Sequence, residues 1–172
     1  MTKKEFMNSV SNAQVDILQQ MLDWLNEKKV DYCVIGGLAV NAFVEPVVSL
    51  DLDLVVVAEA IDDLIKEAEK IFLVERFPHS INLSSTKSDL RIQLQTDPRY
   101  QDFIRRCSMK EVMGYEMKVA SLEDVMQGKI WAYHDDRRRK SKRQKDLADI
   151  YRLVEGYPLL KDLLPESLKK EF

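Results

Sequence analysis

The sequence contains few of the residues that build disulfide-stapled or zinc-binding proteins: among 172 residues there are two cysteines and two histidines. The two cysteines are far apart in the chain and each has apolar neighbours. They therefore match neither a disulfide framework nor a Cys-x-x-Cys metal site. We expect Cys33 and Cys107 to be buried free thiols, and we expect any metal ion to be bound by oxygen atoms.

Long apolar segments are also missing. No apolar run approaches the roughly 20 residues that span a bilayer, and the lysines near the N-terminus are not followed by an apolar segment. These absences predict a cytoplasmic protein that does not associate with a membrane. The content of 45% hydrophobic and 32% charged residues, with five glycines and five prolines, is typical of one folded globular domain and excludes a mainly disordered chain.

Charge is distributed unevenly along the chain. The net charge is −3, but residues 137–145 hold 7 of the 26 basic residues, so the rest of the chain has 19 basic and 29 acidic side chains. Two interpretations of this basic run are open: a solvated helix end or loop, or a surface that binds phosphates or RNA. The candidate acceptor-binding residues of the run are Arg137, Arg138, Arg139, Lys140, Lys142 and Arg143.

The spacing of apolar residues predicts alternating helices and strands. Helical spacing occurs over about 10–28, 38–43, 61–72, 122–136 and 147–156, and strands are predicted over 32–35, 52–57, a hairpin at 81–95 and a pair around Gly114. This order predicts an α/β (α+β) fold, a mixed sheet with flanking helices. We expect residues 1–120 to form the core with an N-terminal packing helix, and residues 121–172 to form a C-terminal helical portion packed on it.

Two carboxylates stand at the start of a predicted apolar strand, in Asp51-Leu52-Asp53-Leu54. An ionised group in a core is costly unless it is paired or binds a metal. At positions i and i+2 both side chains project from the same face, so their oxygens can converge on one or two hard cations. Alone, the pattern also fits two acids at an exposed strand end.

The Gly36-Gly37 pair earlier in the chain favours the metal-binding interpretation of the two acids over an exposed strand end. It closes the predicted strand 32–35 and opens a short helix, where backbone N–H groups can hold phosphate oxygens. A glycine pair by itself is only a turn. The two elements together predict a phosphate site that faces a metal-binding acid pair.

Two further motifs follow in order. One is Lys129-Ile130-Trp131-Ala132 with Arg137, and the other is the Asp-x-x-Asp pattern of Asp146 and Asp149. With the glycine turn and the acid pair, they make residues 31–155 resemble the DNA polymerase beta-like nucleotidyltransferases, specifically the minimal bacterial branch that includes AbiEii-type toxins. The resemblance implies a nucleotidyltransferase-type fold.

The resemblance also implies the chemistry. It implies Mg²⁺-dependent (or Mn²⁺-dependent) transfer of a nucleoside monophosphate from an NTP to a hydroxyl acceptor, which can be RNA such as a tRNA end. Asp51 and Asp53 would hold the metal, and Gly36, Gly37, Ser49 and Lys129 would bind the nucleotide. A cognate antitoxin protein is the implied partner.

The third carboxylate of the fold lacks an obvious counterpart. At its expected mid-strand position stands Gln93, which cannot act as a base, so Asp89 on the same strand face is the candidate. Lys129 interrupts a buried helix face and either extends its ammonium to water or reaches the triphosphate. Asp146 and Asp149 either orient basic residues, add to the site or lie on a helix flank. Two rival functions stay open: a catalytically weakened nucleotide-binding or interaction module, and an RNA-binding protein that uses the basic run.

Overall fold

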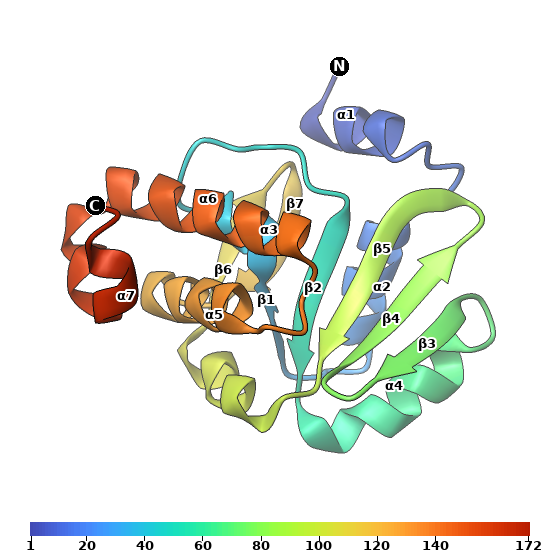
Figure 1. Cartoon of the computed structure of the whole chain (residues 1–172). Helices are drawn as coiled ribbons and strands as arrows, with labels where there is room; N and C mark the ends of the chain where they lie inside the picture. The colour runs from blue at the N-terminus through green and yellow to red at the C-terminus, as the bar shows by residue number, and fades with distance from the viewer.

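The computed structural model describes all 172 residues and contains a seven-stranded mixed sheet, as predicted, with helices on both faces (Figure 1). The strand order is β3-β4-β5-β2-β1-β7-β6. The strands are β1 (Tyr32–Ile35), β2 (Asp51–Val56), β3 (Leu73–Phe77), β4 (Ser80–Ser85), β5 (Ser88–Gln95), β6 (Ser108–Val112) and β7 (Tyr115–Val119). The α-helices are α1 (Lys3–Val10), α2 (Ile17–Glu27), α3 (Gly36–Val40), α4 (Ile61–Ala68), α5 (Leu122–His134), α6 (Lys140–Gly156) and α7 (Glu166–Lys169). Short 3₁₀ segments are η1 (Ala58–Ala60), η2 (Pro98–Arg106) and η3 (Pro158–Leu163).

The three central strands bring the candidate acids together. β2 runs antiparallel to β1 and parallel to β5, and Asp53 is the register partner of both Ile35 and Gln93. Because Ile35 is the last residue of β1, the start of α3 lies directly beside the acid pair. Register therefore connects the glycine turn, the acid pair and the position of the third carboxylate.

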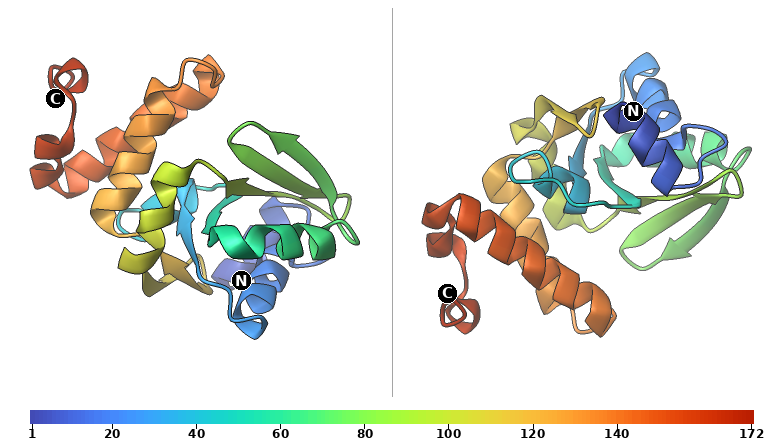
Figure 2. Two further views of the ribbon diagram at one scale, coloured as in Figure 1. Left: turned by 90° about the horizontal axis from the view of Figure 1, so that it is seen from below. Right: turned by 90° about the horizontal axis from the view of Figure 1, so that it is seen from above.

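Helices form a layer on each side of the sheet. α2 and α4 cover one face, whereas α3, α5 and α6 pack together on the other (Figure 2). The apolar side chains form one continuous core that extends from Met7 to Leu168. The first turns of α6 thereby lie over the sheet face from which the acid pair projects.

Several local predictions differ from the structure. The helix predicted over 10–28 begins only at Ile17, because Asn12 adopts a positive φ of 49° and the Asp16 side chain caps α2 by accepting the Gln19 N–H. The preceding helix α1 was not predicted. β3 was not predicted, since its side chains lie at an exposed sheet edge and show no buried face. Cys33 is a buried free thiol as predicted, but Cys107 is only partly buried.

The C-terminal segment is helical, and α6 begins earlier than the apolar spacing indicates. It starts at Lys140, so much of the basic run belongs to a helix rather than to a loop. None of the helices has the length and apolar character that crossing a membrane would require. The division at residue 120 stays a prediction.

Candidate active site

The acid pair projects from β2 on the face covered by α3, α5 and α6. The Asp51 carboxylate accepts a hydrogen bond from Arg91 Nε at 2.9 Å, and Arg91 is its register partner on β5. Asp53, two residues further along the same face, has no such arginine beside it, since its register partner is Gln93. The two carboxylates therefore differ: one is half of an ion pair, and the other faces inward.

Gly36 has to be glycine because of where Asp53 lies. Its φ is +72°, and a Cβ built on it would collide with the Asp53 carboxylate. The neighbouring Gly37 lies against Ser49, whose Oγ would be 3.2 Å from an added Cβ. The predicted glycine turn, Ser49 and the inward acid are thus in direct proximity, and a side chain at position 36 would displace the acid.

Burial, together with the neighbouring charge of Asp51, raises the pKa of Asp53 to about 6. The positive charges of Lys129, Arg138 and Lys142 act in the opposite direction. The surrounding positive charges therefore offset only part of the free-energy cost of ionising the Asp53 carboxylate.

Lys129 lies in the same region, but its ammonium already has partners. Its Nζ is 3.1 Å from Asp146 Oδ1 and 2.8 Å from Asp149 Oδ2, and its side chain is 10% exposed. It does not extend to water, so that interpretation is wrong. The negative partners and Asp53 raise the pKa of Lys129 despite its burial, so it is a fixed positive charge beside the acid pair.

Asp146 and Asp149 orient basic side chains, the first of the three roles considered for them. Asp146 also accepts from Arg138 Nε at 2.7 Å, and Asp149 accepts from Arg152 at 2.8 Å. Arg152 in turn donates to the Asn41 side chain at 3.0 Å, in the segment that follows α3. The network connects α5 and α6 to the segment that leads into β2.

Some side chains of the basic run 137–145 have partners within the protein, and others are exposed. Arg143 donates to the Tyr133 backbone carbonyl at 2.7 Å, and Arg137 pairs with Asp135. Arg139 and Lys140 are exposed. Arg138 and Arg143 are thus engaged within the fold, whereas binding of an acceptor by the basic run stays a prediction.

Lys142 lies in the first turn of α6, half-buried, and its charge interacts with those of Asp51 and Asp53. Partial burial lowers the pKa of Lys142, and the charges of Asp51 and Asp53 oppose that change. No carboxylate lies within ion-pair distance of its ammonium, in contrast to Lys129.

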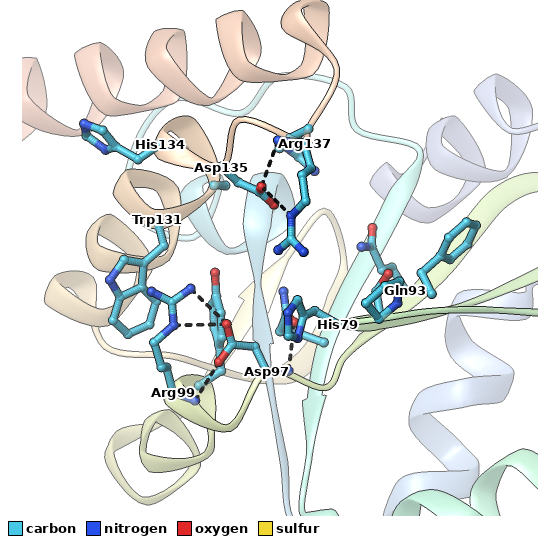
Figure 3. A pocket seen from close by; sticks show the side chains of 15 residues that line it. His79, Gln93, Asp97, Arg99, Trp131, His134, Asp135 and Arg137 are labelled. Atoms are coloured by element: carbon cyan, nitrogen blue, oxygen red, sulfur yellow. Dashed lines mark hydrogen bonds and ion pairs between the residues drawn. The ribbon is translucent and has the colours of Figure 1, made fainter.

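Gly36, Asp53 and Lys129 are among the residues that line a small cleft of about 60 Å³, which opens beside a larger cavity of about 560 Å³. Gln93, Gln95, Tyr100 and Arg138 line both spaces. The larger cavity lies between the turn after β3, the end of β5, η2 and the end of α5 (Figure 3). The arrangement places a small cleft lined by Asp53 directly beside a larger cavity.

The donor set fits a divalent cation that arrives with a nucleotide. No cluster of three or more His, Cys, Asp or Glu side chains is present, so the protein offers two carboxylates. Mg²⁺ is commonly bound by one or two carboxylates, with substrate phosphates and water completing its octahedron. Asp51 and Asp53, beside the backbone of Gly36, match that pattern.

Comparison with known families is consistent with this geometry. The sequence model described as "Nucleotidyl transferase AbiEii toxin, Type IV TA system" matches residues 21–172. The chain belongs to the AbiEii nucleotidyltransferase toxin family. It is thus an enzyme of the nucleotidyltransferase class, as the motifs indicated, and its family is a toxin–antitoxin family.

Solved structures confirm the fold. A lincomycin-bound lincosamide antibiotic adenylyltransferase, LnuA, is similar with a TM-score of 0.57 and 15% identity, over 83% of this chain and 99% of that one. The antibiotic-resistance enzyme ANT(2")-Ia in complex with adenylyl-2"-tobramycin gives a TM-score of 0.59 and 17% identity, over 83% and 88%. No protein of curated function matches the sequence. At these identities the likeness is one of fold.

In this AbiEii family member Asp89 lies two residues before Arg91, the register partner of Asp51, and its role as third carboxylate stays a prediction. It precedes Gln93 by four residues, about 13 Å along an extended strand, and accepts a hydrogen bond from Asn12 at 2.6 Å. Gln93 occupies the position opposite Asp53, so the protein supplies a neutral amide there.

Three side chains of the site escaped the sequence analysis. Arg91 shares a strand face with Gln93, so the alternation of β5 could have placed it opposite Asp51. Arg99 and Asp97 line the larger cavity, but Arg99 lies in η2 and Asp97 caps it, where no hydrophobic period indicates which side chains point inward.

Proposed function

We propose that the protein transfers a nucleoside monophosphate from an NTP to a hydroxyl group, with a divalent cation held by Asp51 and Asp53. The single observation that supports this most strongly is the contact between Gly36 and Asp53. It puts a glycine backbone, where phosphates can approach, directly against a carboxylate that faces inward beside Lys129 and Arg138. Bound Mg²⁺ supplies charge neutralisation of the phosphates and of the attacking oxygen.

The side chains of the chain then take distinct parts. Gly36 and Gly37 provide backbone N–H groups for the terminal phosphates, with Ser49 beside them. Lys142 contributes the free positive charge over the triphosphate, a role that sequence analysis gave to Lys129. Lys129 is held by two aspartates. It provides a fixed positive charge beside Asp53 and connects α5 to α6.

The reaction balances without a third carboxylate. The acceptor oxygen forms a bond to the α-phosphorus, the bond from that phosphorus to the bridging oxygen breaks, and pyrophosphate leaves. Gln93 cannot take the hydroxyl proton, so the proton leaves to water. We therefore expect slower transfer than a carboxylate at that position would give, and Gln93→Glu is the direct test of this expectation.

The decisive experiment incubates the pure protein with each α-labelled NTP, Mg²⁺ and total RNA, and then follows covalent label. We expect label on an RNA acceptor, none with Asp53→Asn, and full labelling with Asp162→Asn, which changes an exposed aspartate elsewhere. Label on another molecule would move the acceptor class away from RNA. Mg²⁺-dependent NTP binding without any transfer would identify a catalytically weakened nucleotide-binding module instead.

Partners and location follow as proposals. The family implies a cognate antitoxin, and co-expression with genes adjacent to the toxin gene would test for relief of toxicity. We propose that the protein acts in the cytoplasm, where NTP and RNA are present.

A further inference from the structure

The cavity of about 560 Å³ beside the acid cleft contains an unusual arrangement of planar groups, which we call the Arg99 cavity (Figure 3). Arg99 Nε and Nη2 both donate to Asp97 Oδ2, at 3.0 and 2.9 Å. Its guanidinium lies 4.5 Å from the ring centroid of Trp131. Two independent contacts thus hold one planar cation at the wall of the cavity.

The support beneath Arg99 is itself rigid. Trp131 stacks on Phe103 with an interplanar angle of 6°, and Tyr100 meets Trp131 edge-on at a centroid distance of 5.0 Å. Phe103 and Tyr100 are buried, whereas the Arg99 side chain is 55% exposed. The guanidinium therefore packs over the indole ring, and about half of the Arg99 side chain stays accessible.

The pairing of charged side chains in the Arg99 cavity indicates which class of ligand it can bind. Both carboxylates that line it are bonded to arginines, Asp97 to Arg99 and Asp135 to Arg137. Arg138 stands at the passage to the acid cleft. A polycationic ligand would find no free carboxylate here, whereas a neutral planar ring attached to phosphates would meet a stacking surface and then an arginine.

We propose that the Arg99 cavity binds a nucleobase, stacked on the accessible face of the Arg99 guanidinium. Arginine planes stack on bases in nucleic-acid complexes, and the volume lies within the range of small-molecule sites. The proposal rests on the proposed function, because the phosphates of the same nucleotide would point past Arg138 toward Asp53. The base belongs either to the incoming NTP or to the terminal nucleotide of an RNA acceptor.

The test uses ligand pairs that differ only in a base. One pair is an NTP and inorganic tripolyphosphate, both with Mg²⁺; the other is a short RNA and the same RNA with an abasic 3′ end. The variant is Arg99→Lys, which keeps the charge and removes the plane. Arg105→Lys on the same segment is the matched control, since Arg105 is 71% exposed and pairs only with Asp102. Affinities are measured by calorimetry.

We expect Arg99→Lys to reduce the advantage of the base-bearing ligand by about fivefold or more in one pair, with tripolyphosphate affinity unchanged. Loss in the NTP pair identifies the substrate base, and loss in the RNA pair identifies the acceptor base. Unchanged ratios in both pairs would overturn the proposal. Failure of the proposed function has a different signature, namely tripolyphosphate binding that does not depend on Mg²⁺ or on Asp53.

A spectroscopic reading locates the base independently. The chain has two tryptophans, so Trp24→Phe leaves Trp131 as the only indole, directly beneath Arg99. We expect the base-bearing ligand to change Trp131 emission and its base-free counterpart to leave it unchanged. Equal spectra with all four ligands would place the base elsewhere.

Discussion

Replacing Asp53 with asparagine should stabilise the fold while removing the proposed metal site. Burial and the adjacent Asp51 raise the pKa of Asp53 from an ordinary value of 3.8 to about 6. A difference of this size corresponds to about 3 kcal/mol that the folded state loses when the carboxylate ionises. For a chain of this length, that free energy corresponds to a rise in Tm of roughly 6–12 °C at neutral pH.

The pH dependence follows from the direction of the shift. Because the folded state binds the Asp53 proton more tightly than the unfolded chain does, the wild-type protein loses this stability as pH rises from about 4 to 6. Above pH 6 the full penalty is present, and below about pH 4 it is absent. The stability difference between Asp53→Asn and wild type should therefore grow through that interval and then remain constant.

Urea unfolding without metal, at several pH values, measures this directly. The matched control is Asp51→Asn, which removes the negative charge 2.9 Å from Arg91 and should cost less than about 1 kcal/mol. Mg²⁺ with NTP should raise the Tm of wild type and leave that of Asp53→Asn unchanged. A destabilised Asp53→Asn variant, or a difference that does not depend on pH, would refute the reasoning.

Three further substitutions test other parts of the structure. Asp146→Asn removes the negative charge shared by two buried or half-buried cations and should cost about 3–5 kcal/mol in urea unfolding, so a loss below about 1 kcal/mol would contradict the network. Gly36→Ala, with its positive φ and its blocked Cβ position, should lower Tm and abolish Mg²⁺-NTP binding, whereas Gly37→Ala should retain most of both. Lys142→Gln should weaken NTP binding, whereas Lys140→Gln should not. Equal effects of the two substitutions would mean that the basic run attracts NTP only through its overall charge.

The sequence alone determined the fold class and the position of the acid pair. Period-two alternation predicted the β4–β5 hairpin, and apolar runs predicted β1 and β2, because burial of one face or both imposes those patterns. Gly36, Gly37, Asp51 and Asp53 stood out for the same reason, since ions and paired glycines interrupt segments that are otherwise apolar. Such signals lie within a few consecutive residues.

Only the tertiary structure decided which charges pair and which remain free. Lys129 and Lys142 are equivalent as lysines in a sequence, yet one is bonded to two aspartates and the other is not. Asp89 and Gln93 share a strand face, but the register of β5 with β2 puts the amide beside Asp53 and the acid about 13 Å away. Arg99 became part of a site because η2 packs against α5. Pairing depends on the register and packing of segments distant in the chain, which no local pattern of residues encodes.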